Sequence, residues 1–551
     1  MAEVSVDILI AGGGSVGLAL ASELGWRGGN CALVEPLREP NPHPRANAVA
    51  NRTMEYFRRW GVDKFLVDAG IASNMPATYF WVTSLHGKEI HRLVLPGQRE
   101  LERMRMGGMV DPKTELHWSP YLKTTVGQDK VETVLRAHVA TRDSVRSLYG
   151  YRLFDFVEDE AGVTSYLATD EGERLTVRSR WLVGCDGGRS VVREKLGTEW
   201  LGRAGLSNFV SIYFRAPTFL QCHGFGPANI FFPLHKKHRG FLLNWDHGVS
   251  WTYHLILDQG TDWQSIDPVQ TIFDLLGCNT EVEVMAVQPW SAHALTADRY
   301  VSDKGRVFIA GDAAHLFSPT GGLGMNTGVS DAIDLAWKLQ ALAEGWGGPG
   351  LSKSYDAERR PIGERNTREA ADNFDRLFSV MQFGDELDSD DADGAKLRAE
   401  LRRELQSQEK LLKSSGVLLG YRYNNSPLCI ADDSLPTDDD PQKYIPVARP
   451  GHRAPHAWLK SRTGSLISIL DLFGPWFTLL CFRGLGQEFK RDQVLSLNAD
   501  VPMEVVNITE PEIRQLYGDK NFVLVRPDLM VAWRGDSLRD IAKTLAVASG
   551  W

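Results

Sequence analysis

Near the amino terminus, a cluster of glycines has the spacing of a phosphate-binding turn. Residues 12–17 read GGGSVG, a GxGxxG pattern. The pattern follows a β-rich apolar run at 4–10 and precedes a helical pattern at 15–26. A glycine-rich turn between a strand and a helix is the phosphate-binding element of dinucleotide sites. The spacing therefore predicts that a dinucleotide binds at this turn.

Each glycine of the pattern has a physical task. Gly12 allows a tight turn, Gly14 lets the backbone approach a pyrophosphate, and Gly17 lets the helix pack closely on the strand. Ser15 and Val16 begin the helix, whose free N–H groups and positive dipole end attract phosphates. These five residues are the predicted phosphate-binding set.

Two carboxylates follow apolar runs and are expected at the same edge of a sheet. Glu35 ends the run at 31–35, about 20 residues after the glycines, where a carboxylate accepts ribose hydroxyls. Asp312 follows the run at 306–310. Ligands of α/β sheets bind beyond the carboxyl ends of the strands. Both side chains are therefore candidates for hydroxyl groups of the same ligand.

The remaining pattern divides the chain into regions of different character. Alternation over 150–183 predicts an antiparallel meander, and residues 205–290 are strand-like and rich in aromatic side chains. Periodic Ala, Ile and Leu predict a helix at 329–342. After a polar, proline-containing linker at 433–441, strand and helix patterns restart, which favours a small α/β domain.

Composition narrows the class of protein. The chain has 551 residues, 43% hydrophobic and 24% charged, with a net charge of −9. This size suggests about three domains, and the acidic balance disfavours nucleic-acid binding. None of the six cysteines forms a CxxC pair, so we expect no metal site and a reducing, cytoplasmic location. No apolar run reaches the length of a membrane span, and no secretory signal begins the chain.

Two further segments give the pattern a family likeness. Residues 185–193 read CDGGRSVVR, and residues 305–315 read GRVFIAGDAAH. With the glycine turn, these motifs resemble the flavin-dependent aromatic hydroxylases in order and separation. The resemblance implies FAD as cofactor, NADH or NADPH as reductant, and an aromatic or phenolic substrate that reacts with dioxygen through a flavin C4a-hydroperoxide.

The resemblance also implies further cofactor contacts. Arg45, Gln128 and Asp186 match positions that the family places near the flavin nucleotide. The segment at 319–326 matches the stretch that touches the flavin ring in the family. From it we predict Pro319, Gly322, Gly324, Met325 and Asn326 as cofactor-binding residues.

One branch of the family is particularly similar. The segment at 44–55 and the tail motifs at 450–456 and 471–474 look like those of phenol, 2,4-dichlorophenol and 2-hydroxybiphenyl hydroxylases. That branch tends to carry an aspartate at the position of Asn47, and asparagine cannot act as a base. Any phenol deprotonation must therefore come from elsewhere, or the substrate must arrive ionised.

The family fold gives the expected architecture. We expect a Rossmann-like FAD-binding domain of the para-hydroxybenzoate-hydroxylase type, a β-sheet substrate domain and a thioredoxin-like C-terminal α/β domain. A homodimer is a further expectation. The predicted divisions are 1–190 (FAD-binding), 191–300 (substrate sheet), 301–430 (completion of the FAD-binding domain and a helical region) and 442–551 (thioredoxin-like).

The base that activates the substrate is left open. Tyr300 and Arg299 precede the third motif, where a phenol hydroxyl and a guanidinium would stabilise a phenolate. The predicted catalytic group also contains His43 and His235, because a base with a pKa near the working pH is useful. His238 and Asp246 are further candidates on the same argument.

Two alternatives compete with the hydroxylase. One is another FAD-dependent enzyme on the same scaffold, such as a halogenase or a hydroxylase of non-aromatic rings. Flavin halogenases carry paired tryptophans followed by Ile-Pro, and neither Trp245 nor Trp251 is followed by Ile-Pro. The other is a protein that sequesters an aromatic ligand, which intact cofactor motifs argue against.

Overall fold

The first sheet contains the predicted βαβ unit. The computed structural model describes residues 2–71, 75–107, 115–246, 248–278, 280–412, 414–461, 464–482 and 500–551. Five strands of this sheet run parallel: β1 (Ala2–Ala11), β2 (Cys31–Glu35), β7 (Val145–Tyr149), β10 (Arg174–Gly184) and β16 (Val307–Ile309). β8 (Arg152–Glu158) and β9 (Val163–Ala168) extend it with antiparallel pairing, which confirms the predicted meander.

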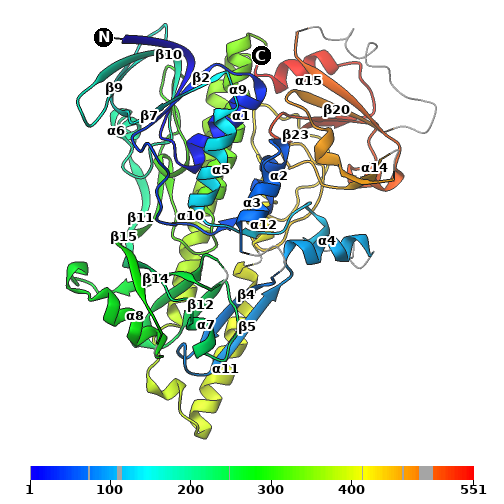
Figure 1. The fold of residues 1–551 in the computed structure, drawn as a ribbon. Helices are drawn as coiled ribbons and strands as arrows, with labels where there is room; N and C mark the ends of the chain where they lie inside the picture. Colours follow the sequence, from blue (N-terminus) through cyan, green and yellow to red (C-terminus); the bar gives the residue numbers. More distant parts are fainter. Residues whose placement is uncertain are drawn as a thin grey trace.

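Three helices pack together beside this sheet (Figure 1). They are α1 (Ser15–Arg27), α5 (Gln128–Ala140) and α9 (Gly324–Glu344). The helix predicted at 329–342 is α9, and it begins earlier, at Gly324. Its amino terminus therefore lies within the glycine-rich segment at 319–325, which positions that segment at a helix end.

The second sheet has eight strands in the order β17-β15-β11-β14-β13-β12-β4-β5. Its strands are β4 (Ala77–Val82), β5 (Glu89–Leu95), β11 (Trp200–Arg215), β12 (Ile230–Pro233), β13 (Gly240–Asn244), β14 (Ser250–Leu257), β15 (Glu283–Ala297) and β17 (His315–Leu316). β4 and β5 precede the predicted division at 191, yet β4 pairs in parallel with β12. The substrate sheet thus takes a hairpin from the amino-terminal part of the chain.

Two long helices support the second sheet. α10 (Gly350–Ser379) packs on β15, and α11 (Ala392–Leu412) packs on β5 (Figure 1). The other helices before the C-terminal domain are α2 (Asn51–Arg59), α3 (Asp63–Ala69), α4 (Gln98–Met106), α6 (Val191–Lys195), α7 (Phe219–Cys222), α8 (Pro268–Leu276) and α12 (Ser415–Leu418). Two short strands, β3 (Ala48–Val49) and β6 (Thr124–Thr125), pair near the glycine-rich segment. Within the described ranges, no helix combines the length and apolar character needed to cross a bilayer.

The C-terminal domain is built on a mixed four-stranded sheet. A parallel pair is followed along the chain by an antiparallel pair and a final helix, the core arrangement expected of a thioredoxin-like domain. Its elements are β20 (Phe477–Phe482), β21 (Met503–Ile508), α14 (Pro511–Leu516), β22 (Phe522–Val525), β23 (Val531–Gly535) and α15 (Ile541–Ala548), with a separate hairpin of β18 (Trp458–Lys460) and β19 (Leu466–Ser468).

A buried group of charges joins this domain to the helices α9 and α10. Arg526 contacts Glu358 at 2.5 and 2.9 Å, Asp528 at 2.6 Å and Asp334 at 3.2 Å. Lys338 contacts Asp334 at 2.7 Å and Glu358 at 2.5 Å. Burial raises the pKa of Asp334, and the positive charges of Lys338 and Arg526 offset part of the rise. Two cations thus face the carboxyl groups of Asp334, Glu358 and Asp528 in the interior.

Candidate active site

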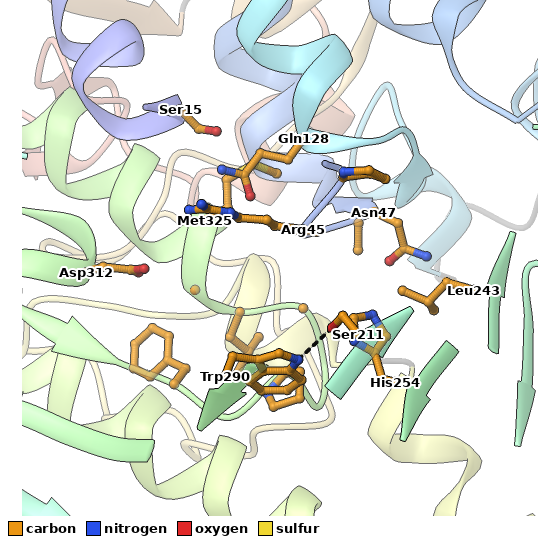
Figure 2. Close-up of a pocket in the computed structure, with 18 of the residues that line it drawn as sticks. Ser15, Arg45, Asn47, Gln128, Ser211, Leu243, His254, Trp290, Asp312 and Met325 are labelled. Carbon is orange, nitrogen blue, oxygen red and sulfur yellow. Dashed lines mark hydrogen bonds between the residues drawn. The ribbon is translucent and has the colours of Figure 1, made fainter. Parts of the chain in front are cut away.

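A single cavity of about 700 Å³ connects the two sheets. One end is lined by the β1–α1 turn and by Glu35 and Gln128, and the other by side chains of the eight-stranded sheet. Figure 2 shows Ser15 and Gln128 on one side of it, with Ser211, His254 and Trp290 across the space. The cavity is therefore long enough to bring a nucleotide-binding turn and an aromatic wall into one site.

The glycine turn has the geometry that its sequence predicts. Gly12 has a φ of +107°, and a Cβ there would lie 2.3 Å from the carbonyl oxygen of Cys185. A Cβ on Gly17 would lie 1.9 Å from the carbonyl oxygen of Gly12. These two glycines shape the turn without lining the cavity, whereas Gly14, Ser15 and Val16 line it.

Glu35 closes the nucleotide end. Its carboxylate accepts hydrogen bonds from the backbone N–H of Gly13 at 2.7 Å and of Leu37 at 2.9 Å. The side chain also lines the cavity. The carboxylate is thus held at the end of β2, where it was predicted to meet a ribose.

A residue that sequence reasoning missed lies beside the same turn. Glu132 accepts hydrogen bonds at Oε1 from the backbone N–H of Ser15 (3.2 Å), its hydroxyl (3.0 Å) and the Gln128 amide (2.8 Å). The four-residue spacing of Gln128 and Glu132 on α5 puts both on one helix face, which was the available signal. These donors are the ones that a diphosphate would use.

The glycine-rich segment at 319–325 forms the middle of the cavity. Gly321 and Gly322 have φ values of +90° and +67°, a conformation that favours glycine. Pro319, Gly322, Gly324 and Met325 all line the cavity, as predicted for a segment that contacts a ring. Backbone N–H groups at the start of α9 are available to stabilise negative charge there.

Asn326 supports this segment rather than lining the cavity. Its amide donates to the carbonyl oxygens of Ala48 at 2.9 Å and Gly322 at 2.7 Å. Its Oδ1 accepts from the Ala50 N–H at 2.8 Å and the Thr53 hydroxyl at 2.7 Å. All the hydrogen-bonding capacity of the side chain is used in fixing the glycine-rich segment against β3 and α2.

The two motif aspartates have different surroundings. Asp312, in the short turn after β16, faces the cavity (Figure 2). Burial raises its pKa, and the charges of His315 and Arg45 offset part of the rise. Asp186 instead accepts hydrogen bonds from the Ser190 hydroxyl at 2.5 Å and the Val192 N–H at 3.2 Å, so it fixes the start of α6. Of the two, only Asp312 lines the cavity.

Aromatic side chains form the opposite end of the cavity. Five rings from four strands of the second sheet line it: Tyr79, Trp81, Phe232, Phe241 and Trp290. Such a surface suits a planar apolar ligand. The sequence predicted an aromatic substrate sheet but not which rings would face the ligand.

His43 and Arg45, two of the predicted site residues, also line the cavity. The His43 ring lies 5.8 Å from that of Tyr213, and its Nδ1 lies 3.1 Å from the carbonyl oxygen of Pro44. Burial lowers the pKa of His43, so the ring is neutral and can accept a proton. Asn47 and Arg45 lie on the same side of the cavity (Figure 2).

The structure does not bring Tyr300, Arg299 or His235 to this cavity. Tyr300 is fully buried against His315 and Tyr355, and its hydroxyl has no partner within the described part of the chain. The other two side chains make polar contacts with nearby residues. Arg299 bonds to the carbonyl oxygen of Leu196, and His235 accepts from the Lys237 N–H and lies 3.1 Å from Asp385.

The two further candidates, Asp246 and His238, also lie outside the cavity lining. Asp246 accepts two backbone N–H groups, from Val249 and Ser250, both at 2.8 Å. It therefore holds the turn before β14, and neither Asp246 nor His238 lines the cavity.

Lys123 is a second residue that the sequence analysis missed. Its Nζ donates to the carbonyl oxygen of Gly321 at 3.2 Å, and the side chain lines the cavity. Burial lowers the pKa of Lys123 to about 8. A positive charge is thus available beside the glycine-rich segment. Because burial disfavours this charge, the amine loses its proton more easily than an ordinary lysine does.

This placement predicts unusual reactivity of Lys123. At pH 8 about half of its amine is neutral, against well below about 1% of an ordinary lysine. In FAD-free protein, acetylation by an N-hydroxysuccinimide ester followed by peptide mass spectrometry should modify Lys123 faster than Lys304. Lys304 is the matched control, because its bond to Glu160 raises its pKa. FAD should slow the reaction at Lys123 alone. Equal rates, or no protection, would contradict the assignment.

Comparison with known proteins agrees with this geometry. A family model described as FAD binding domain matches residues 5–370, and one described as aromatic-ring hydroxylase, C-terminal, matches residues 447–551. Aklavinone 12-hydroxylase RdmE of Streptomyces purpurascens is 32% identical over 99% of this chain and 98% of its own.

Two solved structures have the same fold over the whole chain. The rebeccamycin biosynthetic enzyme RebC with reduced flavin has a TM-score of 0.87 and 33% identity, with 100% of each chain covered. Aklavinone-11 hydroxylase in ternary complex with FAD and aklavinone has a TM-score of 0.81 and 30% identity, covering 100% of this chain and 99% of that one.

Proposed function

We infer the substrate from the premise that this chain belongs to the family of FAD-dependent aromatic-ring hydroxylases. It is a flavoprotein monooxygenase of aromatic compounds, with NAD(P)H as the reductant typical of the family. We propose that its substrate is a fused-ring aromatic with a hydroxyl or carbonyl oxygen on the ring. The observation that carries the proposal is the single cavity that joins the nucleotide turn to a wall of five aromatic side chains.

The residues of the cavity fit FAD, and we propose a role for each. The N–H groups of Gly14, Ser15 and Val16 would hold the diphosphate, with Gln128 and Arg45 beside it. Glu35 would accept the adenosine ribose hydroxyls, and Asp312 those of the ribityl chain. Pro319, Gly322, Gly324 and Met325 would contact the ring. When bound, FAD supplies the activation of dioxygen; the protein positions the substrate and keeps water out.

Proton handling is the other task of the chain. Asn47 lines the cavity but cannot accept a proton, so His43 is the base that we propose for a phenolic substrate. Its Nε2 is buried without a partner among the described residues. That the protein forms a homodimer and that it is cytoplasmic remain predictions from the sequence.

The experiment is anaerobic reduction of the FAD-loaded protein. NADH or NADPH is mixed with it alone and with phenol, 2-naphthol or 1,8-dihydroxyanthraquinone, and the bleaching of the flavin band is followed. We expect the fused-ring compounds to accelerate bleaching at least tenfold, since they fill the aromatic end. Acceleration by phenol alone would contradict a fused-ring substrate and indicate a single-ring one. Bleaching that is indifferent to every compound would overturn the proposed substrate class.

A further inference from the structure

Three side chains on one face of the second sheet form a hydrogen-bonded chain at the aromatic end of the cavity. The Trp290 indole N–H donates to Ser211 Oγ at 2.7 Å, and Ser211 Oγ lies 2.7 Å from His254 Nδ1. All three residues line the cavity (Figure 2). The cofactor roles proposed above assign no function to them.

Strand register explains why these residues meet. Ser211 and His254 are direct partners across β11 and β14, so their side chains share a face of the sheet. Trp290 pairs with Phe209, two residues from Ser211 and therefore on the same face. The Trp290 ring stacks on Phe209 with centroids 4.1 Å apart, and the His254 ring lies 4.6 Å from Phe241. Both rings are held in place by aromatic neighbours.

The direction of the hydrogen bonds fixes the tautomer of the histidine. An indole nitrogen only donates, so Ser211 Oγ accepts from Trp290 and has its own proton to give. Among the described residues, the structure shows no other acceptor for that proton than His254 Nδ1. Burial lowers the pKa of His254 to about 3, so the ring is neutral at pH 7. With Nδ1 accepting, the single ring proton must lie on Nε2.

Nε2 of His254 is the free end of the chain. The residue is 5% exposed, and Nε2 has no hydrogen-bond partner within the described part of the chain, although it is not fully enclosed. Because Nε2 is not fully enclosed and its residue lines the cavity, an acceptor oxygen on a ligand can take its hydrogen bond. The neighbouring surface is aromatic, so the ligand that reaches it is a planar ring.

We propose that Ser211 and Trp290 hold His254 with its proton on Nε2, and that this N–H selects ring substrates bearing an acceptor oxygen, either a phenolate or a carbonyl. The proposal rests on the proposed function and adds a specificity-determining residue to it. His254 donates a hydrogen bond and does not act as the base, which is the role proposed above for His43.

The tautomer is tested directly by nitrogen NMR of FAD-loaded protein labelled with ¹⁵N-histidine. We expect the His254 signals of a neutral ring with the proton on Nε2, and a mixture of tautomers in Ser211→Ala. A proton on Nδ1, or a charged ring at pH 7, would overturn the proposal without affecting the proposed function.

The selectivity is tested by binding of 2-naphthol and naphthalene to the FAD-loaded protein, followed by perturbation of the flavin spectrum. These probes have the same ring and differ only in the oxygen. We expect His254→Phe to weaken 2-naphthol binding about tenfold and leave naphthalene unchanged, since one hydrogen bond is lost. Ser211→Ala and Trp290→Phe should each weaken 2-naphthol binding a few-fold. His254→Gln keeps an N–H donor, so it should bind 2-naphthol more tightly than His254→Phe does.

His223→Phe is the matched control. His223 is a histidine of the same region whose Nδ1 accepts a backbone N–H at 3.2 Å, but it does not line the cavity. If His254→Phe and His223→Phe bind 2-naphthol equally well, the present proposal is overturned and the proposed function stands. If the wild type binds neither probe, both are overturned together.

Discussion

Replacing Asp312 by alanine is expected to give a protein that purifies without its yellow colour. Asp312 presents a carboxylate to the cavity from the end of a buried strand, where the ribityl hydroxyls of FAD would lie. Hydrogen bonds to a charged acceptor contribute about 1.5–3 kcal/mol each, which corresponds to roughly 10- to 100-fold in affinity. The measurement is the ratio of flavin to protein after purification, together with the dissociation constant for added FAD.

Asp186→Ala is the matched control for that experiment. Asp186 is the other motif aspartate, but its carboxylate holds the Ser190 hydroxyl and the Val192 N–H at the start of α6. We expect this variant to bind FAD normally and to lose about 1 kcal/mol of stability, as for other losses at a helix start. Normal loading of Asp312→Ala, or a colourless Asp186→Ala, would reverse the roles given to the two aspartates.

Replacing Arg526 by methionine is expected to destabilise the protein by about 3–5 kcal/mol. Arg526 is fully buried between Glu358, Asp528 and Asp334, and its removal leaves carboxylates in the interior with Lys338 as the remaining cation in the group. An uncompensated buried charge has a cost of this size. Thermal and urea unfolding of the FAD-loaded protein measure the loss.

Arg58→Met separates this effect from the mere loss of a contact between domains. Arg58 also joins the amino-terminal part of the chain to the C-terminal domain, through Asp471 at 2.6 and 2.8 Å, but both side chains are about 30% exposed. Partly exposed pairs contribute at most about 1 kcal/mol. If Arg526→Met does not yield folded protein, Arg526→Lys keeps the charge and should show a smaller loss. A loss below about 1 kcal/mol in Arg526→Met would refute the assigned role.

Local sequence patterns identified many of the residues that line one half of the cavity. Gly12 and Gly17 occupy positions where a Cβ would collide with backbone, and Asp312 faces the cavity from the end of its strand. These features depend on a few consecutive residues, so spacing alone reveals them. Asn326 shows the limit of such reasoning: it belongs to the right segment, but its amide is used to hold that segment in place.

The substrate half depends on strand pairing, which a single sequence does not specify. His254 and Trp290 lie 43 and 79 residues from Ser211 along the chain, and the three meet only through the register of β11, β14 and β15. The hairpin of β4 and β5 joins this sheet from a region assigned to the other domain. Tyr300 fits the chemistry by residue type, yet the structure buries its ring in the core, against Tyr355.

The buried charges around Arg526 limit which C-terminal domains can be exchanged between related proteins. Arg526 and Asp528 come from the tail, whereas Asp334, Lys338 and Glu358 come from α9 and α10. A domain exchange at the linker would separate the tail residues of this charge group from those on α9 and α10. If the donor tail lacks Arg526 or Asp528, the chimaera has an unbalanced interior charge along α9, the helix that begins at the glycine-rich segment. Compatible parents are therefore recognisable from five side chains, before any gene is built.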